Sequence, residues 1–221
     1  MPTDTDTWSG KATGGKKMKK LILFCLIGVF VMTSTVVFAQ EKAPLGIGNL
    51  ALKVDYIAFT EDDLDDLDVD SDLYLGIEGF YEVSPNFYLG LEVGWTNPEG
   101  DVYDVDTELT YVPVELNLKY AAEVSPHFVI GFGAGVSYNY AEIELDAATG
   151  TFEDIETGEE LGSSVDEDEW LFGGQLFLDL NYTFDAFFFG INGKYQLTEE
   201  GDDLDVSFDN WRIGGQIGFF F

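Results

Sequence analysis

The feature that most constrains this chain is an alternation of apolar with polar or small residues along a series of segments. A period of two is typical of β-strands whose two faces meet different surroundings. After residue 40, no apolar run approaches the ~20 residues that a membrane-spanning helix needs. The alternating segments number eight, at approximately 46–60, 67–83, 87–97, 108–122, 128–144, 169–184, 187–197 and 209–221.

The connections between these segments are short and long in turn. Short turns lie at 84–86, 125–127 and 185–186, and longer acidic connections lie at about 61–66, 98–107, 145–168 and 198–208. A weak repeat accompanies the turns, since EVSPNFYLGLEVG (82–94) aligns with EVSPHFVIGFGAG (123–135). This pattern predicts an all-β fold, an eight-stranded antiparallel up-and-down transmembrane β-barrel with periplasmic N- and C-termini.

Each expected strand has one apolar face. In the third segment Leu89, Leu91 and Val93 share one face, and Glu92 lies between two glycines on the other. Alternation alone does not say which face points inward, because a soluble barrel keeps its apolar face inside and a membrane barrel turns it to lipid. Aromatic residues on the apolar face gather near both strand ends, as expected for two interfacial belts. The alternative is that these aromatic residues form the core of a secreted soluble β-sandwich.

The N-terminal region supports export. Residues 16–20 read KKMKK, an apolar stretch follows at 21–37, and Val37 and Ala39 occupy the −3 and −1 positions of a cleavage site. These features predict a signal peptide at 18–39 that is cleaved near Ala39, an unstructured upstream extension at 1–17 and a barrel domain at 40–221. A membrane anchor is the alternative, although the stretch is short for one. Cys25, the only cysteine, lies within it.

The last segment is a C-terminal strand with a final Phe. Its apolar face carries Trp211, Ile213, Ile217, Phe219 and Phe221. This strand resembles the terminal signal by which outer-membrane proteins are recognised for assembly. Residues 45–221, including TYVPVELNLKY (110–120) with its proline, resemble the outer-membrane beta-barrel domain family of small OmpX- and OmpA-barrel-like proteins. The resemblance implies an outer-membrane barrel of a Gram-negative bacterium, placed there by the barrel assembly machinery.

Charged residues on the polar face form a separate group. A lone charge in a narrow interior is costly, whereas a paired and hydrogen-bonded charge is tolerated. Eight strands leave an interior just wide enough for side chains to fill. We therefore predict an ion-pair network that plugs the lumen, formed by Lys53, Asp55, Glu78, Glu92, Glu115, Lys119, Asp179, Lys194 and Arg212. The alternative is that these groups are hydrated and only loosely paired.

Most of the remaining acidic residues lie in the long connections. The formal net charge is −32, and cleavage after Ala39 would leave 40 acidic and 5 basic residues, a net charge of −35. Oxygen-rich clusters without cations suit Ca²⁺ or Mg²⁺. Candidate ligands are Asp66, Asp68, Asp70 and Asp72, which strand alternation places on one face above the lumen, although the glycine and glutamate of an EF-hand are missing. The alternative is a solvated, repulsive surface.

The composition excludes several functions. So acidic a chain lacks the cationic surface that nucleic acids require. His127, the only histidine, lies in a short turn away from the long loops, so we expect no enzyme.

We expect a monomeric barrel of structural or surface-interaction type in the outer membrane, with an unknown extracellular partner and no cofactor besides Ca²⁺ or Mg²⁺. The alternatives are an OmpW-like transport barrel for small apolar solutes and a cation-binding surface protein.

Overall fold

A computed structural model describes residues 43–61, 64, 67–102, 105–147, 152–153, 160–162, 164–201 and 206–221. The expected upstream extension (1–17), the expected signal peptide (18–39) and its cleavage site at Ala39 lie outside these residues. Among the residues described, no helix is both long and apolar enough to cross a membrane.

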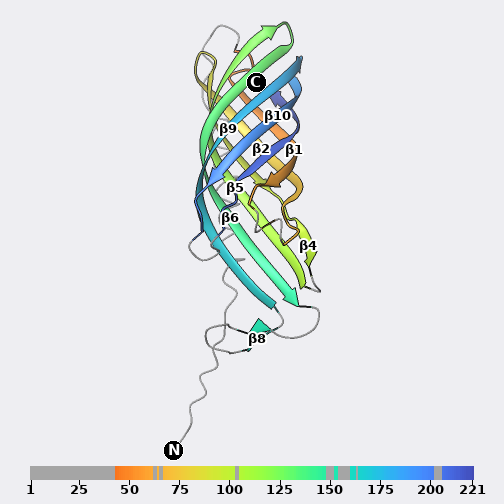
Figure 1. Cartoon of the computed structure of the whole chain (residues 1–221). Helices are drawn as coiled ribbons and strands as arrows, with labels where there is room; N and C mark the ends of the chain where they lie inside the picture. The colour runs from red at the N-terminus through yellow and green to blue at the C-terminus, as the bar shows by residue number, and fades with distance from the viewer. Residues whose placement is uncertain are drawn as a thin grey trace, which may run out of the picture. The chain divides into compact units, whose positions relative to one another are not determined.

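Eight antiparallel strands form a closed ring (Figure 1). They are β1 (Gly48–Phe59), β2 (Ser71–Ser84), β3 (Phe87–Trp95), β5 (Val105–Ser125), β6 (Phe128–Ala147), β9 (Ser164–Phe184), β10 (Phe187–Thr198) and β11 (Asn210–Phe220). Each strand pairs with the next in this order, and β11 closes the ring on β1, from Asn49 opposite Phe220 to Phe59 opposite Asn210. The predicted up-and-down barrel is therefore confirmed.

Short strands extend the ring at its long-loop end. β4 (Glu99–Val102) pairs with β5 beyond the end of β3, whereas β7 (Phe152–Glu153) and β8 (Glu160–Gly162) pair with each other. β5, β6 and β9 also run further into this region than we expected, because the acidic residues that suggested loops continue the ladder. Asp106, for example, lies opposite Asp146, and Glu142 lies opposite Asp168.

Backbone conformation explains the tight turns at the other end. Asn86, His127 and Asp185 have positive φ angles of 69°, 84° and 51°. Asn, Asp and His are the non-glycine residues most enriched in this region of φ/ψ space. One residue of this kind lies in each short turn, so adjacent strands reverse direction within two residues.

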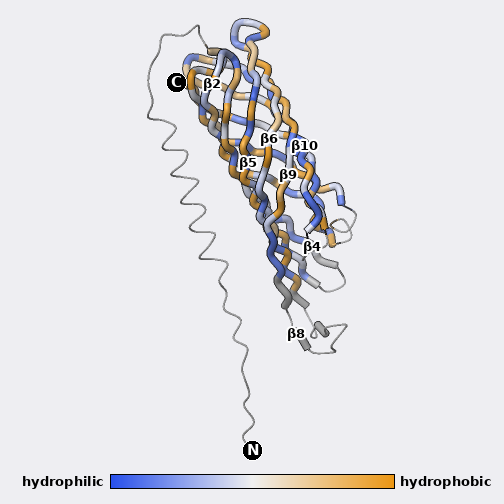
Figure 2. The backbone as a smooth tube through the Cα atoms, turned by 90° about the vertical axis from the view of Figure 1, so that its left-hand side faces the viewer, coloured by the Kyte–Doolittle hydropathy of each residue, from blue (hydrophilic) through white to orange (hydrophobic). Residues whose placement is uncertain are grey.

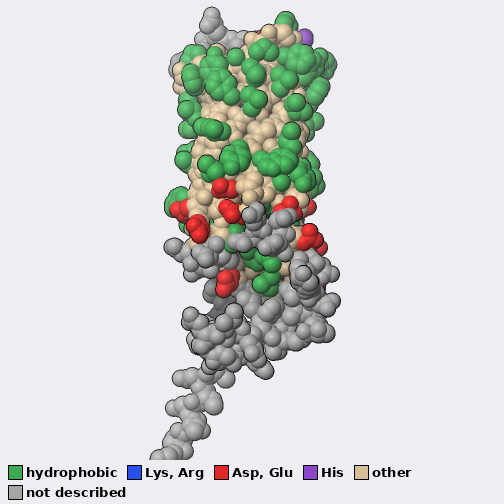
Figure 3. Space-filling view, viewed as in Figure 1, with side chains coloured by type: hydrophobic (Ala, Val, Ile, Leu, Met, Phe, Trp, Pro, Cys, Tyr) green, Lys and Arg blue, Asp and Glu red, His purple; other side chains and the backbone are tan. Residues whose placement is uncertain are grey.

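Apolar side chains cover the outside of the ring. Leu52, Phe172, Leu176 and Ile191 are 59–65% exposed. In Figure 2 the hydropathy of successive residues alternates along the strands. In Figure 3 hydrophobic side chains cover the visible wall toward the short-turn end, and carboxylates lie toward the long-loop end. The outer face also carries aromatics at both levels where we expected belts; the exposed ones include Phe87, Phe128, Phe187 and Phe221 near the short turns and Trp95, Tyr138, Tyr195 and Trp211 near the long loops. An apolar exterior of this kind suits contact with lipid rather than water.

Candidate functional site

The barrel interior is built in three layers. An apolar cluster near the short turns, here called the short-turn cluster, consists of Leu45, Ala51, Phe80, Tyr88, Ala121, Val129 and Phe188. A second, the long-loop cluster, consists of Ile57, Phe59, Leu64, Val69, Tyr74, Leu109, Tyr111, Ala141, Ile143, Leu171 and Phe208. Between them, inward-facing positions of the same strands carry charged and amide side chains. This middle layer is the candidate site.

All nine charged residues that we assigned to the lumen point into the middle layer. Their side chains are at most 5% exposed. Of the residues that the structure describes, no other charged residue is buried. Every one of the nine lies within 4 Å of an opposite charge. These nine residues are here called the ion-pair layer.

The tightest contacts centre on two glutamates in adjacent strands. Glu92 of β3 lies opposite Glu115 of β5, so two carboxylates meet side by side. Lys194 bridges them, with its Nζ 2.7 Å from Glu92 Oε2 and in an ion pair with Glu115. Arg212 donates from Nη2 to Glu115, and Lys53 Nζ lies 3.1 Å from Glu92. Three cations thus neutralise two carboxylates that would otherwise repel one another.

The contacts around Lys119 are longer. Its Nζ lies 3.7 Å from Glu78 and 3.6 Å from Asp179. Lys53 lies 3.7 Å from Glu78 and 3.9 Å from Asp55. Lys119 Nζ also sits 3.9 Å from the centre of the Phe80 ring, a cation–π distance. The ion-pair layer therefore has a tight half around Glu115 and a looser half around Lys119.

Neutral side chains that were not predicted from the sequence add to the ion-pair layer. Gln175 donates to Asn117 Oδ1 at 2.8 Å, and Tyr74 donates to Glu92 at 2.9 Å. Asn192 donates to Asp55 at 2.9 Å, and Gln196 accepts from Arg212 at 3.1 Å. Their inward parity was a readable signal, since each alternates with lipid-facing residues on its strand. Tyr74, Asn192 and Gln196 thus add hydrogen bonds to Glu92, Asp55 and Arg212 beyond the ion pairs.

Glycines on β6 make room for these long side chains. Gly131, Gly133 and Gly135 all face inward, opposite residues of β5 and β9 that fill the interior. A Cβ at Gly135 would overlap the side-chain oxygen of Asn117 and the carbonyl oxygen of Leu116. Small residues on one strand thus allow large ones on its neighbours.

We expect Gly135→Ala to lower the free energy of unfolding by about 1–3 kcal/mol, because overpacking forces neighbours out of place. The matched control is Gly174→Ala on the outer face, where the nearest atom to the new Cβ, Gly135 O, is 3.7 Å away. Alanine there should leave stability equal or slightly higher, since glycine weakens a strand. Urea unfolding of refolded protein measures both; equal effects at the two positions would contradict the interior packing.

The long-loop cluster is capped by residues from two loops. Leu64 and Val69 follow β1, Phe208 precedes β11, and all three are buried. Hydrogen bonds join these loops, from Thr60 N to Asp209 O at 2.8 Å and from Ser207 Oγ to Glu61 at 2.6 Å. The ion-pair layer is therefore covered by apolar side chains at its long-loop end as well as at its short-turn end.

The structure corrects the position of the candidate calcium ligands. Asp68 and Asp70 precede β2, and Asp68 has a φ of 57°, so only Asp72 lies in that strand. The chain turns here because Leu64 and Val69 are drawn into the long-loop cluster. The expectation that these aspartates share one strand face is wrong, and Asp66 lies outside the described residues. Asp72 instead accepts from Thr96 Oγ1 and Asn97 N, both at 3.3 Å.

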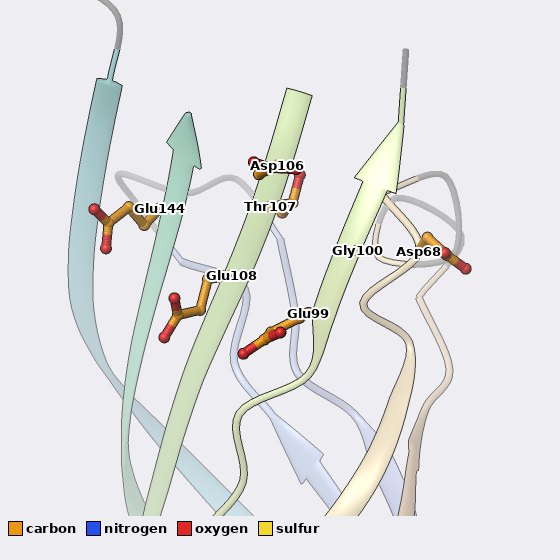
Figure 4. Close-up of a pocket in the computed structure, with 7 residues that line it drawn as sticks. All are labelled: Asp68, Glu99, Gly100, Asp106, Thr107, Glu108 and Glu144. Atoms are coloured by element: carbon orange, nitrogen blue, oxygen red, sulfur yellow. The ribbon is translucent and has the colours of Figure 1, made fainter. Parts of the chain in front are cut away.

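Other carboxylates line a hollow of about 660 Å³ at the long-loop end. Figure 4 shows Glu99, Glu108 and Glu144 on the adjacent strands β4, β5 and β6, with Asp68 across the hollow. Glu108 lies directly opposite both Glu99 and Glu144. Within the described part of the chain, no group of three or more His, Cys, Asp or Glu residues is placed to hold a metal ion. Cation binding at this end stays a prediction.

The C-terminal residues that we assigned to the assembly signal lie on the outer face of β11. Trp211, Ile213, Ile217, Phe219 and Phe221 are 40–61% exposed. At the end of the ladder, Phe221 exchanges backbone hydrogen bonds with Gly48, at 3.0 and 2.8 Å. The face that we expected the assembly machinery to recognise is thus an exposed apolar surface of the closed barrel.

His127 lies apart from the ion-pair layer. It is exposed in the turn between β5 and β6, and its Nδ1 is 3.1 Å from the carbonyl oxygen of Thr183. Its ring also lies beside that of Tyr182, with 5.7 Å between centres. His127 thus contacts a backbone carbonyl and an aromatic ring.

Comparisons with known proteins agree with this architecture. A family model described as outer membrane protein beta-barrel domain matches residues 21–219. No curated protein matches the chain in sequence. Among solved structures, Neisserial surface protein A is similar with a TM-score of 0.50 and 9% identity over 79% of this chain and 96% of that one. At this identity the likeness concerns the fold alone.

Two further structures have the same kind of similarity at lower scores. OprG from Pseudomonas aeruginosa has a TM-score of 0.47 and 18% identity, covering 82% of this chain and 99% of its own. Ail, the attachment invasion locus protein of Yersinia pestis, has a TM-score of 0.44 and 14% identity, covering 78% and 97%.

Proposed function

This chain belongs to the outer membrane protein beta-barrel domain family, and on that basis we propose that it is a closed, non-conducting barrel whose loop end meets the cell exterior. Its role is structural or that of a surface-interaction protein. The ion-pair layer, together with the apolar clusters on either side of it, plugs the lumen. The proposal places the short turns in the periplasm and includes no catalytic activity and no resident cofactor.

One observation carries the proposal, namely that the charged interior is enclosed by apolar side chains at both ends. An open pore needs a continuous hydrated path. Here Tyr111 stacks on Phe208 with ring centres 5.8 Å apart at one end, and Phe188 and Tyr88 are buried at the other. Water would have to displace one cluster to reach the charged groups, and both clusters to form a continuous path, so ion flow is disfavoured.

We expect purified protein in planar lipid bilayers to show no stable, large conductance. Glu115→Ala serves as the comparison, because it removes one of the two carboxylates that both Arg212 and Lys194 contact and so loosens the ion-pair layer. A large and steady conductance of the unaltered protein, with single-channel steps, would contradict the plug. The heat-dependent gel mobility of folded barrels confirms that the same preparation is folded.

Transport of small apolar solutes is the competing proposal. A solute leaving through the barrel wall would need an interior path, and the described interior is filled by the clusters and the ion-pair layer. Uptake of a small apolar solute by liposomes that contain the protein separates the two. Uptake equal to that of empty liposomes supports the closed barrel, and protein-dependent uptake supports transport.

The acidic loop end is the part that would meet an extracellular partner. Glu99, Glu108 and Glu144 on adjacent strands form a repulsive surface that favours cations over anionic molecules. Specific binding of Ca²⁺ or Mg²⁺ is a second form of this proposal. The support for it is the acid-rich composition of this end, and the partner in either case is recognised by positive charge.

A further inference from the structure

The first described residues of the chain fold against its last one. Ala43–Gly48, here called the N-terminal strap, begins with a turn in which Gly46 N donates to Ala43 O at 3.1 Å. Gly46 has a φ of 69°, which only glycine adopts without cost. The strap then pairs with both neighbours of β1, through Ile47 O with Glu82 N at 2.8 Å and through Gly48 with Phe221.

Leu45 of the strap enters the interior. It is completely buried and belongs to the short-turn cluster. The Tyr88 hydroxyl holds it from β3, accepting from Leu45 N at 3.3 Å and donating to Gly46 O at 3.1 Å. Asn49 adds a bond from Nδ2 to Leu45 O at 3.4 Å. Leu45, which precedes β1, therefore supplies one of the side chains that close the short-turn end of the ring.

The strap also packs against the C-terminal residue. A Cβ at Gly46 would come within 2.7 Å of Phe221 O, and one at Gly48 within 2.7 Å of the Phe221 ring. Gly46 must therefore be glycine for the strap to lie this close to the backbone of Phe221, whereas a side chain at Gly48 would require the exposed Phe221 ring to move. The contacts join the strap to the C-terminal residue at the seam between β1 and β11.

We propose that the N-terminal strap is a stopper, meaning a segment that closes the short-turn end of the barrel. The Leu45 side chain fills this end, and the Tyr88 hydroxyl holds the strap in place through its two hydrogen bonds. Opening the strap at Leu45 would admit water to the interior from that end while the ring of strands stays intact, because Leu45 precedes β1 and lies outside the eight-stranded ladder. The long-loop end would stay closed, since it is covered by Leu64 and Phe208. This stopper is independent of what the loop end binds.

Thiol labelling tests the stopper. In a Cys25→Ser background the chain has no other cysteine, so one reporter at a time is introduced by Ala121→Cys in the short-turn cluster or Ala141→Cys in the long-loop cluster. Both alanines are completely buried. We expect Leu45→Ser to raise the rate at which a water-soluble maleimide labels the Ala121→Cys reporter at least tenfold. The Ala141→Cys reporter should label at an unchanged rate.

Two further variants complete the test. Tyr88→Phe removes only the hydroxyl and should raise labelling at Ala121→Cys by a smaller factor. Val124→Ser alters an exposed apolar residue at the same end and should change neither reporter. Heat-dependent gel mobility identifies the folded fraction on which rates are measured. Unchanged labelling at Ala121→Cys in folded Leu45→Ser protein, or an equal rise at both reporters, would overturn the stopper.

Discussion

Arg212→Ala is expected to lower the free energy of unfolding by about 3–5 kcal/mol, the range typical when one partner of a buried ion pair is removed. Arg212 is 1% exposed and donates to Glu115, which is completely buried. Its guanidinium also faces the Tyr74 ring at 4.5 Å. Without it, Glu115 retains Lys194, but Lys194 must also serve Glu92. The loss is measured by urea unfolding of the refolded barrel in detergent or lipid.

Companion variants separate charge from packing. Arg212→Met keeps much of the side-chain volume and should lose nearly as much stability as Arg212→Ala. The pair Arg212→Met with Glu115→Gln removes one charge of each sign and should cost less than the two single changes added together. Lys119→Met should cost less than Arg212→Met, because the nearest carboxylate oxygens to Lys119 are 3.6 and 3.7 Å away. Stability restored by methionine at 212 would show that packing rather than pairing accounts for the loss.

Strand parity explains why so much of this interior was predictable. In a barrel, each residue of a strand faces either lipid or lumen, so a charged residue such as Lys194 between Gly193 and Tyr195 has only one tolerable direction. The same rule places Glu92 and Glu115 on the lumenal faces of their two strands, whatever the register between those strands. The distances between them were not predictable, because they depend on the stagger of neighbouring strands.

The depth of a residue along the barrel axis could not be predicted from strand parity. Tyr111 and Leu109 face inward like Glu115, yet they lie at the long-loop end and pack as a soluble barrel core does. Alternation predicts which face of the strand a residue occupies but not its depth along the barrel axis, so the two apolar clusters were not predicted. The prediction that Asp66, Asp68, Asp70 and Asp72 share one strand face was wrong for a related reason. Their spacing suits a strand, but the burial of Leu64 and Val69 bends the chain into a turn.

The lipid-facing wall gives the second large effect, since Ile191→Arg is expected to cost about 2–4 kcal/mol of unfolding free energy. Ile191 is 65% exposed near the middle of β10, where a cation would meet hydrocarbon. Phe187 lies on the same face of the same strand and is 60% exposed. It is four residues closer to the short turn, about 13 Å along the strand. Phe187→Arg should therefore cost only about 0–1 kcal/mol beyond the lost side chain.

Alanine references make the comparison sharp. Ile191→Ala and Phe187→Ala remove each side chain without adding charge, so the difference between arginine and alanine at each site isolates the cost of the cation. Measurements by urea unfolding in lipid bilayers of known thickness should give a clear excess at 191. In detergent micelles, which adapt to the side chain, the excess should shrink. Equal arginine costs at both positions would mean that β10 does not cross hydrocarbon, and the outer face would then need a covering other than lipid.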